Sequence, residues 1–399
     1  MNLFFFIFSK FKNIKINKGF LSFNFYLSIF LISISLTALI LTESFTSGYK
    51  KSILSKIGAF SSDVRIVSNQ DIHFNDAQYQ FYNNLSKTDN NIDWSFFKES
   101  IGIIFSKNKS SSFDSLKYSQ REGVYVLGLN QYAFDHLIDI KKYFLKDDNQ
   151  ISNDNIIIGN FLAKKLNKTF GDSITLIIPN SQNDVKFHNF IISNIYHTGT
   201  KMDNFLIYIS MDRIKYLSDS TITGIMANFD SNNYNDIFNF INDDSIAIKY
   251  KNDDNLAIIN FLNKFDRPIK LLMWILMFLS LYSLSTVMYN FIIEKKKDLK
   301  ILYCLGLNSN YLKKITVSIS FYITLISILI GIFLSTIIIY IQNKFHIINL
   351  PSEQIFQVSI LPADFSFIYL IKYPLILLIT AFLMTFYIYK RKIEINFND

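Results

Sequence analysis

The sequence contains few of the residues from which catalytic centres and disulfide-linked domains are built. A single cysteine, Cys304, excludes an intrachain disulfide and a zinc cluster made of thiolates. His73, His136, His188 and His197 are scattered without metal-ligand spacing, and neither G-x-S-x-G nor G-x-x-x-x-G-K-[ST] occurs. We therefore expect no catalytic, cofactor-binding or metal-binding residues, and a chain that is not an enzyme and does not hold ATP in a P-loop.

Charged residues are nearly missing from four long apolar stretches, at 20–42, 271–293, 316–341 and 368–389. Each approaches or exceeds the roughly 20 residues that cross ~30 Å of hydrocarbon. None contains a carboxylate, histidine or arginine, and Lys372 lies near one end of the last stretch, where it can snorkel. Because ionisable groups inside a membrane usually mark ion paths or catalytic pairs, their absence argues against an ion-coupled carrier and an intramembrane protease.

These stretches predict a polytopic α-helical membrane protein with four transmembrane helices and a large α+β extracytoplasmic domain between helices 1 and 2. The predicted segments are a cytoplasmic amphipathic N-terminus at 1–19, transmembrane helices at 20–42, 267–293, 315–342 and 368–389, a periplasmic domain at 43–266, a cytoplasmic loop at 294–314, a periplasmic loop at 343–367 and a cytoplasmic tail at 390–399.

The distribution of lysine and arginine predicts the orientation. Residues 43–266 carry 23 basic and 26 acidic side chains, whereas the rest of the chain carries 17 and 6. The excess basic residues precede the first span and follow the last span, and six lysines lie within 294–314. The segment 343–367, by contrast, contains Lys344 alone. The positive-inside rule then places both termini and the 294–314 loop in the cytoplasm. A nucleic-acid partner is not expected.

The first apolar stretch is longer than the core of a signal peptide, and the TESFTSGY that follows has no A-x-A-like cleavage site, so we expect an uncleaved anchor. The lysine-containing residues before it suit an amphipathic helix on the membrane surface or a disordered N-terminus.

The large outer domain shows patterns of both strands and helices. Alternation and turn signals predict strands at 62–67, 123–129, 187–195, 205–209 and 222–230, a strand–helix–turn–strand unit at 155–178, helices at 211–217 and 233–242, and polar loops at 68–93 and 106–119.

A stripe of small residues follows one face of the third span. Its spacing of four, three, four and four residues predicts a tight helix-packing seam, within the chain or between subunits, because small residues let helix backbones approach in lipid. The alternative is that serine is simply tolerated there. The residues are Ser320, Thr324, Ser327, Gly331 and Ser335.

The loop EKKKDLKILYCLGLNSNYLKK at 294–314 predicts a short amphipathic helix between two spans. Asp298 suits its first turn and Gly306 its C-terminal end, and Asn308 or Ser309 can cap the next helix. Such a helix could dock on a cytosolic partner, or the segment could be a plain lysine-rich connector.

Three segments resemble FtsX-like/MacB-type ABC transporter permeases. The loop is similar to a recurrent E-K-x-x-D-I-x-I-L-x-x-L-G pattern, IIIGNFLAKKLNKTFGDSITLIIP resembles a G-x-x-L-A-x-x-L-x-x-x-x-G-D segment of the outer domain, and ILPADFSFIYL resembles the lipoprotein-releasing (LolC/LolE-type) branch. The order of one span, a large outer domain and three spans also matches. The resemblance assigns an ATPase-coupling helix to Glu294, Lys295, Asp298, Leu299, Leu302, Leu305 and Gly306.

The resemblance implies a permease subunit that extracts lipoproteins from the inner membrane and passes them to a periplasmic carrier. It implies cytosolic ABC ATPase subunits and a second permease copy or paralogue as partners. Two alternatives stay open: a related exporter permease for peptides or small toxic compounds, and a non-transporting FtsX-type regulator of cell-wall hydrolases, which usually has a much smaller outer domain.

Overall fold

The computed structural model describes residues 20–68, 93–106, 120–146, 151–179, 185–218, 222–228, 246–251 and 256–392. The chain forms two compact units. One unit contains residues 1–50, 261–349 and 360–399, and the other contains residues 51–260 together with 350–359. The predicted N-terminal amphipathic segment and the predicted helix at 233–242 lie outside the described residues.

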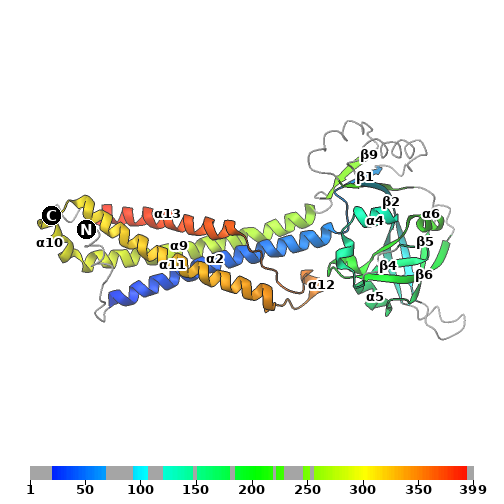
Figure 1. The fold of residues 1–399 in the computed structure, drawn as a ribbon, viewed down its shortest axis with the longest axis horizontal. Coiled ribbons are helices and arrows are strands. Elements are labelled where there is room, and N and C mark those ends of the chain that lie inside the picture. Colours follow the sequence, from blue (N-terminus) through cyan, green and yellow to red (C-terminus); the bar gives the residue numbers. More distant parts are fainter. Residues whose placement is uncertain are drawn as a thin grey trace. The chain divides into compact units, whose positions relative to one another are not determined.

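The first unit is a bundle of long helices, which run side by side in Figure 1. By length and composition, four of the described helices could cross a membrane. These helices extend beyond the apolar stretches. The two longest have 39 residues each and span about 58 Å, whereas the hydrocarbon layer of a membrane is only ~30 Å thick. The helices are α2 (Phe20–Gly58), α9 (Leu256–Glu294), α11 (Ser309–Phe345) and α13 (Phe367–Lys392).

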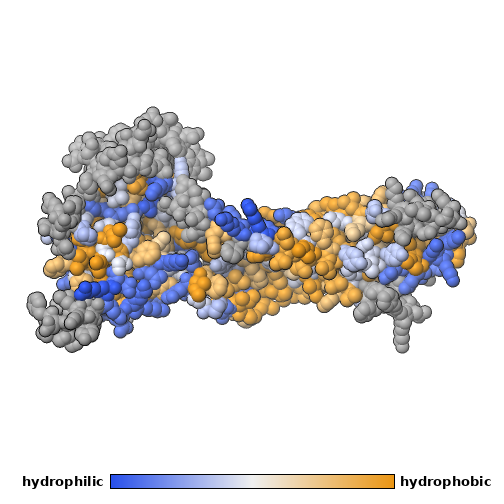
Figure 2. Space-filling model, turned by 180° about the vertical axis from the view of Figure 1, so that it is seen from behind, coloured by the Kyte–Doolittle hydropathy of each residue, from blue (hydrophilic) through white to orange (hydrophobic). Residues whose placement is uncertain are grey.

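Apolar side chains cover the outside of this bundle, as Figure 2 shows for one face, and they also fill its core. Leu272, Phe278 and Phe333 are more than half exposed, whereas Leu36, Leu284 and other aliphatic residues are buried between the helices. A helix that is apolar all round suits lipid on the outside and protein on the inside.

The second unit contains nine strands in the part of the chain that the structure describes, in the order β3-β7-β4-β6-β5-β2-β8-β1-β9. An extra β2–β3 pairing joins six of them into a ring. The strands are β1 (Val64–Ser68), β2 (Asp93–Phe105), β3 (Arg121–Leu129), β4 (Asn155–Gly159), β5 (Ser173–Pro179), β6 (Val185–Tyr196), β7 (Leu206–Ser210), β8 (Gly224–Asn228) and β9 (Ile246–Tyr250).

Alternate residues of the six ring strands enter one apolar core, which includes Ile104, Val126 and Ile158. Helices α5 and α6 add Leu162 and Ile214 to this core. A second core, around Phe97, packs against the opposite face. The shorter elements are α4 (Gln131–His136), η2 (Ile140–Tyr143), α5 (Asn160–Leu166), η3 (Lys201–Asn204), α6 (Met211–Leu217), α10 (Lys296–Cys304) and α12 (Glu353–Phe356).

The structure contains elements that the sequence did not predict, among them strand β9 and helix α4. The 13-residue strand β2 occupies a region for which the sequence predicted no element, and the outer unit takes residues 350–359 from the loop between α11 and α13.

The small-residue stripe of α11 is buried inside the chain's own bundle: Ser320, Thr324, Ser327, Gly331 and Ser335 are all covered. A Cβ on Gly331 would lie 3.0 Å from Leu36 Cδ2 and 3.1 Å from the Ser33 carbonyl oxygen of α2. Thr37 Oγ1 donates to the Gly331 carbonyl oxygen over 3.2 Å. The glycine therefore lets two helix backbones approach closely.

Enlarging Gly331 should destabilise the bundle. We expect Gly331→Leu to lower the unfolding temperature of the purified protein in detergent, at a cost of about 1–3 kcal/mol for an overpacked contact, and Gly331→Ala to cost less. The control is Ile330→Leu on the exposed neighbouring position. Equal thermal stability of Gly331→Leu and the control would contradict the packing argument.

Candidate functional site

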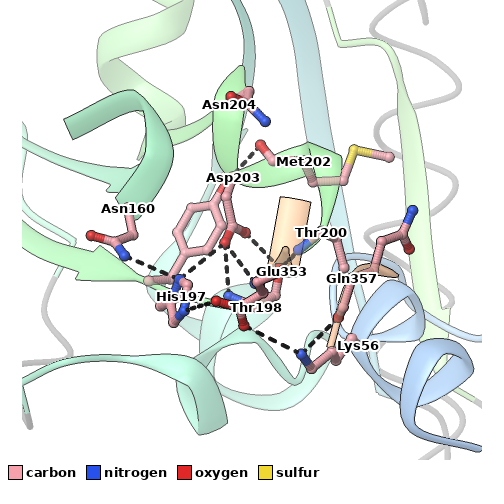
Figure 3. A network of polar contacts seen from close by, with 12 residues as sticks. Lys56, Asn160, His197, Thr198, Thr200, Met202, Asp203, Asn204, Glu353 and Gln357 are labelled. Atoms are coloured by element: carbon pink, nitrogen blue, oxygen red, sulfur yellow. Dashed lines mark hydrogen bonds and ion pairs between the residues drawn. The ribbon is translucent and has the colours of Figure 1, made fainter. Parts of the chain in front are cut away.

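A network of polar contacts holds the loop between α11 and α13 on the β domain (Figure 3). It joins three parts of the outer unit that are distant in sequence: the end of α2, the turn between β6 and β7, and α12. Lys56 near the end of α2 donates to the Gln357 carbonyl oxygen over 2.9 Å and lies 4.0 Å from Glu353 Oε1. The site is therefore an attachment, built from charges and backbone groups.

Asp203, in η3, shapes the turn after β6. Its side chain is fully buried, and its Oδ2 accepts from the backbone N–H of Thr198 at 2.9 Å and of Gly199 at 2.8 Å. Thr198 Oγ1 donates to Asp203 Oδ1 over 2.5 Å. Buried charge of this kind needs such donors to offset its lost hydration. The turn approaches β4 so closely that a Cβ on Gly159 would lie 2.3 Å from the Asp203 carbonyl oxygen.

His197 connects this turn to α12. Its Nε2 lies 3.0 Å from Glu353 Oε2, and its Nδ1 lies 3.5 Å from Asp203 Oδ2 and 3.1 Å from Asn160 Nδ2. The hydrogen bond with Asp203 raises the pKa of His197 above its usual value, with help from the charge of Glu353 and against the effect of burial. In the charged ring both nitrogens donate, one to each carboxylate, whereas in the neutral ring the Asn160 amide can donate to Nδ1.

Gly199 brings the turn against Glu353. Its φ of +75° lies in the region that favours glycine, and an added Cβ would meet Glu353 Oε1 at 2.4 Å. The carboxylate that pairs with His197 thus occupies the space that any other residue at position 199 would fill.

Helix α10 has the ends that the sequence predicts. Asp298 lies in its first turn, 3.0 Å from Lys295 Nζ, and Gly306 follows its last residues with φ +91°. The N–H of Gly306 bonds the Tyr303 carbonyl oxygen and the N–H of Leu307 bonds that of Leu302, which is a Schellman motif.

The residues assigned to coupling divide between two faces of this helix. Leu299 is buried and Leu302 packs partly on the bundle, whereas Leu305 is 76% exposed. Exposed Glu294 and the Lys295–Asp298 pair lie at the start of the segment. Ile301, 60% exposed, also matches the recurrent loop pattern and lies one turn before Leu305 on the outward surface, whereas Tyr303 was not assigned from the sequence but is exposed as well.

The residues that the structure describes contain no group of three or more His, Cys, Asp and Glu side chains that could hold a metal ion. The sequence interpretation treated His197 as an ordinary histidine. Its partner Glu353 lies 156 residues away, so no local pattern could have joined them.

Four apolar helices and a separate β domain define a polytopic membrane protein with a large domain outside the lipid. Comparison with protein families matches the MacB-like periplasmic core domain to residues 25–258 and the FtsX-like permease C-terminal domain to residues 270–397. The comparison with curated proteins gives no match. Because the first match alone covers more than half of the sequence, the chain belongs to the MacB/FtsX-type ABC permeases, which are transmembrane proteins of the bacterial inner membrane with a periplasmic domain.

A methyl group at position 199 should release the loop. We expect Gly199→Ala to raise amide hydrogen exchange in residues 350–359, because the new Cβ displaces the Glu353 carboxylate and strains the backbone. Gly171→Ala is the matched control, since Gly171 has φ +81° and open space around its Cβ. Equal exchange in the loop of both variants would show that Gly199 does not position Glu353.

The attachment should weaken as pH rises. Because the folded state raises the pKa of His197, the charged ring stabilises the contact fully below the unfolded value of ~6.5, and this stabilisation is lost as pH rises through the raised pKa. We expect protection of residues 350–359, corrected for intrinsic exchange rates, to fall over that range. His197→Gln should remove this component, and an unchanged pH profile in the variant would refute it.

Proposed function

We propose that this chain is the permease subunit of an ABC machine that extracts lipoproteins from the inner membrane for a periplasmic carrier. A separate cytosolic ATPase subunit hydrolyses ATP, and α10 docks on it. Movement of α10 then passes through the long helices to the β domain, with the α12 attachment as one connection. The cargo site is completed by a second permease copy or a paralogue.

The observation that carries the proposal is the exposed apolar surface at the end of α10. Ile301 and Leu305, one turn apart, project outward on a helix whose other face is fixed to the bundle by Leu299, and Tyr303 is also exposed. A cluster of this kind is typical of a docking site, since desolvated apolar and aromatic side chains carry most of the energy of an interface. The surrounding lysines support a cytoplasmic location for this surface, where an ATPase would be available.

The continuity of the helices supports mechanical coupling. Helix α9 runs unbroken from Leu256, in the outer unit, to Glu294, two residues before α10 begins. Helix α2 likewise runs from the bundle into the outer unit. A displacement at α10 can therefore reach the β domain along these helices.

The choice of lipoproteins as cargo rests on the resemblance of ILPADFSFIYL to the lipoprotein-releasing branch. In the structure this segment follows α12, and Asn349 and Ile360 form a β-bridge at the point where the loop returns to the bundle. The large β domain also differs from the smaller outer domain that is usual for a regulator of cell-wall hydrolases.

Loss of docking should leave lipoproteins in the inner membrane. In cells depleted of the protein, we expect wild-type chain to restore their transfer and Ile301→Glu/Leu305→Glu to fail, because burying two carboxylates opposes docking. The variant should also lose the ATPase subunit on co-purification. Ile347→Glu, at an exposed apolar position at the other end of α11, is the control.

Two results would contradict this function. Unchanged lipoprotein sorting after depletion would remove lipoproteins as cargo and leave the exporter or the regulator. Reaction of Cys304, which is exposed, with a membrane-impermeant thiol reagent in intact cells would place α10 on the wrong side of the membrane.

A further inference from the structure

The bundle contains a cavity of about 170 Å³ whose chemistry the transport mechanism does not use. It lies between three helices, which contribute one to two turns each. Its lining consists of Leu39, Thr42 and Glu43 of α2, Ile269, Lys270, Met273, Trp274 and Met277 of α9, and Lys372, Tyr373 and Ile376 of α13.

The lining is divided into a charged end and an apolar end. Lys270, Lys372 and Glu43 lie at the ends of the apolar stretches, on the side where the chain enters the β domain. Trp274 and Met277 follow Lys270 by one and two turns, and the seven steps from Lys270 to Met277 cover about 10 Å along the helix axis. A tryptophan beside charged residues marks the border between headgroups and hydrocarbon.

Two prolines give a physical reason for a cavity at this level. Pro268 lies inside α9 and Pro374 inside α13, each within two residues of lining side chains. A proline inside a helix removes one backbone hydrogen bond and clashes with the preceding turn, so the helix bends there. Prolines in two of the three neighbouring helices therefore weaken the regular helix packing at the level of the cavity.

The charges at the cavity favour an anionic group. Lys270 lies 3.9 Å from Asp266, but that carboxylate is shared with Lys50 at 3.4 Å. Lys372 lies over the ring of Tyr373, and Tyr373 is hydrogen-bonded to Glu43. The lining thus contains two ammonium groups and one carboxylate, and this carboxylate already accepts a hydrogen bond from the Tyr373 hydroxyl.

We propose that this cavity binds one diacyl phospholipid from the leaflet on the side of the β domain. Its phosphate lies between Lys270 and Lys372, and the upper part of one acyl chain lies along Met273, Trp274 and Met277. The lining's net charge of one positive unit matches a monoanionic phosphodiester. A lipid anchor without phosphate, such as the diacylglyceryl group of a lipoprotein, lacks the group that the lysines recognise. This site is independent of the cargo proposed above.

Trp274 supplies a direct reporter of occupancy. The full-length protein, purified with its bound subunits, is titrated in detergent with brominated phosphatidylethanolamine, and quenching of tryptophan fluorescence is followed. We expect saturable quenching at a lipid fraction about tenfold or more below that for brominated diacylglycerol, since hydrogen bonds to charged groups each contribute about a factor of ten. Trp274→Phe should remove the saturable part and leave Trp94, the other tryptophan, as background.

The variant Lys270→Gln/Lys372→Gln should bind the two brominated lipids equally. The control Lys264→Gln/Lys344→Gln removes two lysines outside the cavity and should keep the preference. Native mass spectrometry gives a second measurement: one retained phospholipid in the wild type and the control, and none in the cavity variant.

Three outcomes would overturn the proposal: equal quenching by phospholipid and diacylglycerol in the wild type, a preference that survives in the cavity variant, or displacement of the phospholipid by a diacylglyceryl lipopeptide at equal concentration. The last outcome would identify a general acyl site. None of these outcomes depends on lipoprotein sorting, so the two proposals fail separately.

Discussion

The carboxylate of Glu353 is the contact on which the arrangement of the outer unit depends. It lies between Lys56 and His197, which come from α2 and from the turn after β6. The three side chains are only partly exposed, so water screens their attraction less than it would at an open surface. One short helix of four residues, α12, could not hold its position through its own hydrogen bonds, and the charges of its neighbours fix it instead.

This contact changes how the two units are connected. The chain passes between them at residues 50–51 and 260–261, and again on both sides of residues 350–359. The last two crossings would form an ordinary loop of the bundle if Glu353 were released. With Glu353 held, residues 350–359 belong to the outer unit, so the segments that connect the two units include those that lead to α11 and α13 as well as α2 and α9.

Helix α2 also fixes the returning arm of that loop within the bundle. Ser44 Oγ donates to the Asp364 carbonyl oxygen over 2.7 Å, and the Asp364 N–H donates to the Ser44 carbonyl oxygen over 3.0 Å. Gly48 allows the contact, because a Cβ there would lie 2.4 Å from the Pro362 carbonyl oxygen. Lys56, two turns further along the same helix, bonds Gln357. Both ends of the attachment therefore depend on the position of α2.

Local sequence patterns were enough to predict the long helices, most strands and the Gly306 helix end, because apolar periodicity and glycine at positive φ are local signals. Strand β2 was missed because Lys98 and Glu99 interrupt its alternation. Lys98 is nevertheless buried, and Glu99 bonds Arg65 of β1, so the charges are accommodated by tertiary contacts. The His197–Glu353 contact was missed because it too is a tertiary contact, and the sequence around His197 does not show which distant residue is its partner.

The division of α10 into an inward and an outward face favours a rigid helix over a flexible connector. Leu299 is buried, and the Schellman motif turns the chain directly from α10 into the Asn308 cap of α11, whose side chain accepts from the Asn310 N–H over 3.3 Å. In the coupling that we propose, a force applied to Ile301 and Leu305 would act on the ends of α9 and α11 together. Helix α9 continues into the residues of the outer unit, and α11 leads to the loop that contains Glu353, so the proposed coupling has two routes along the chain that start from the same short helix.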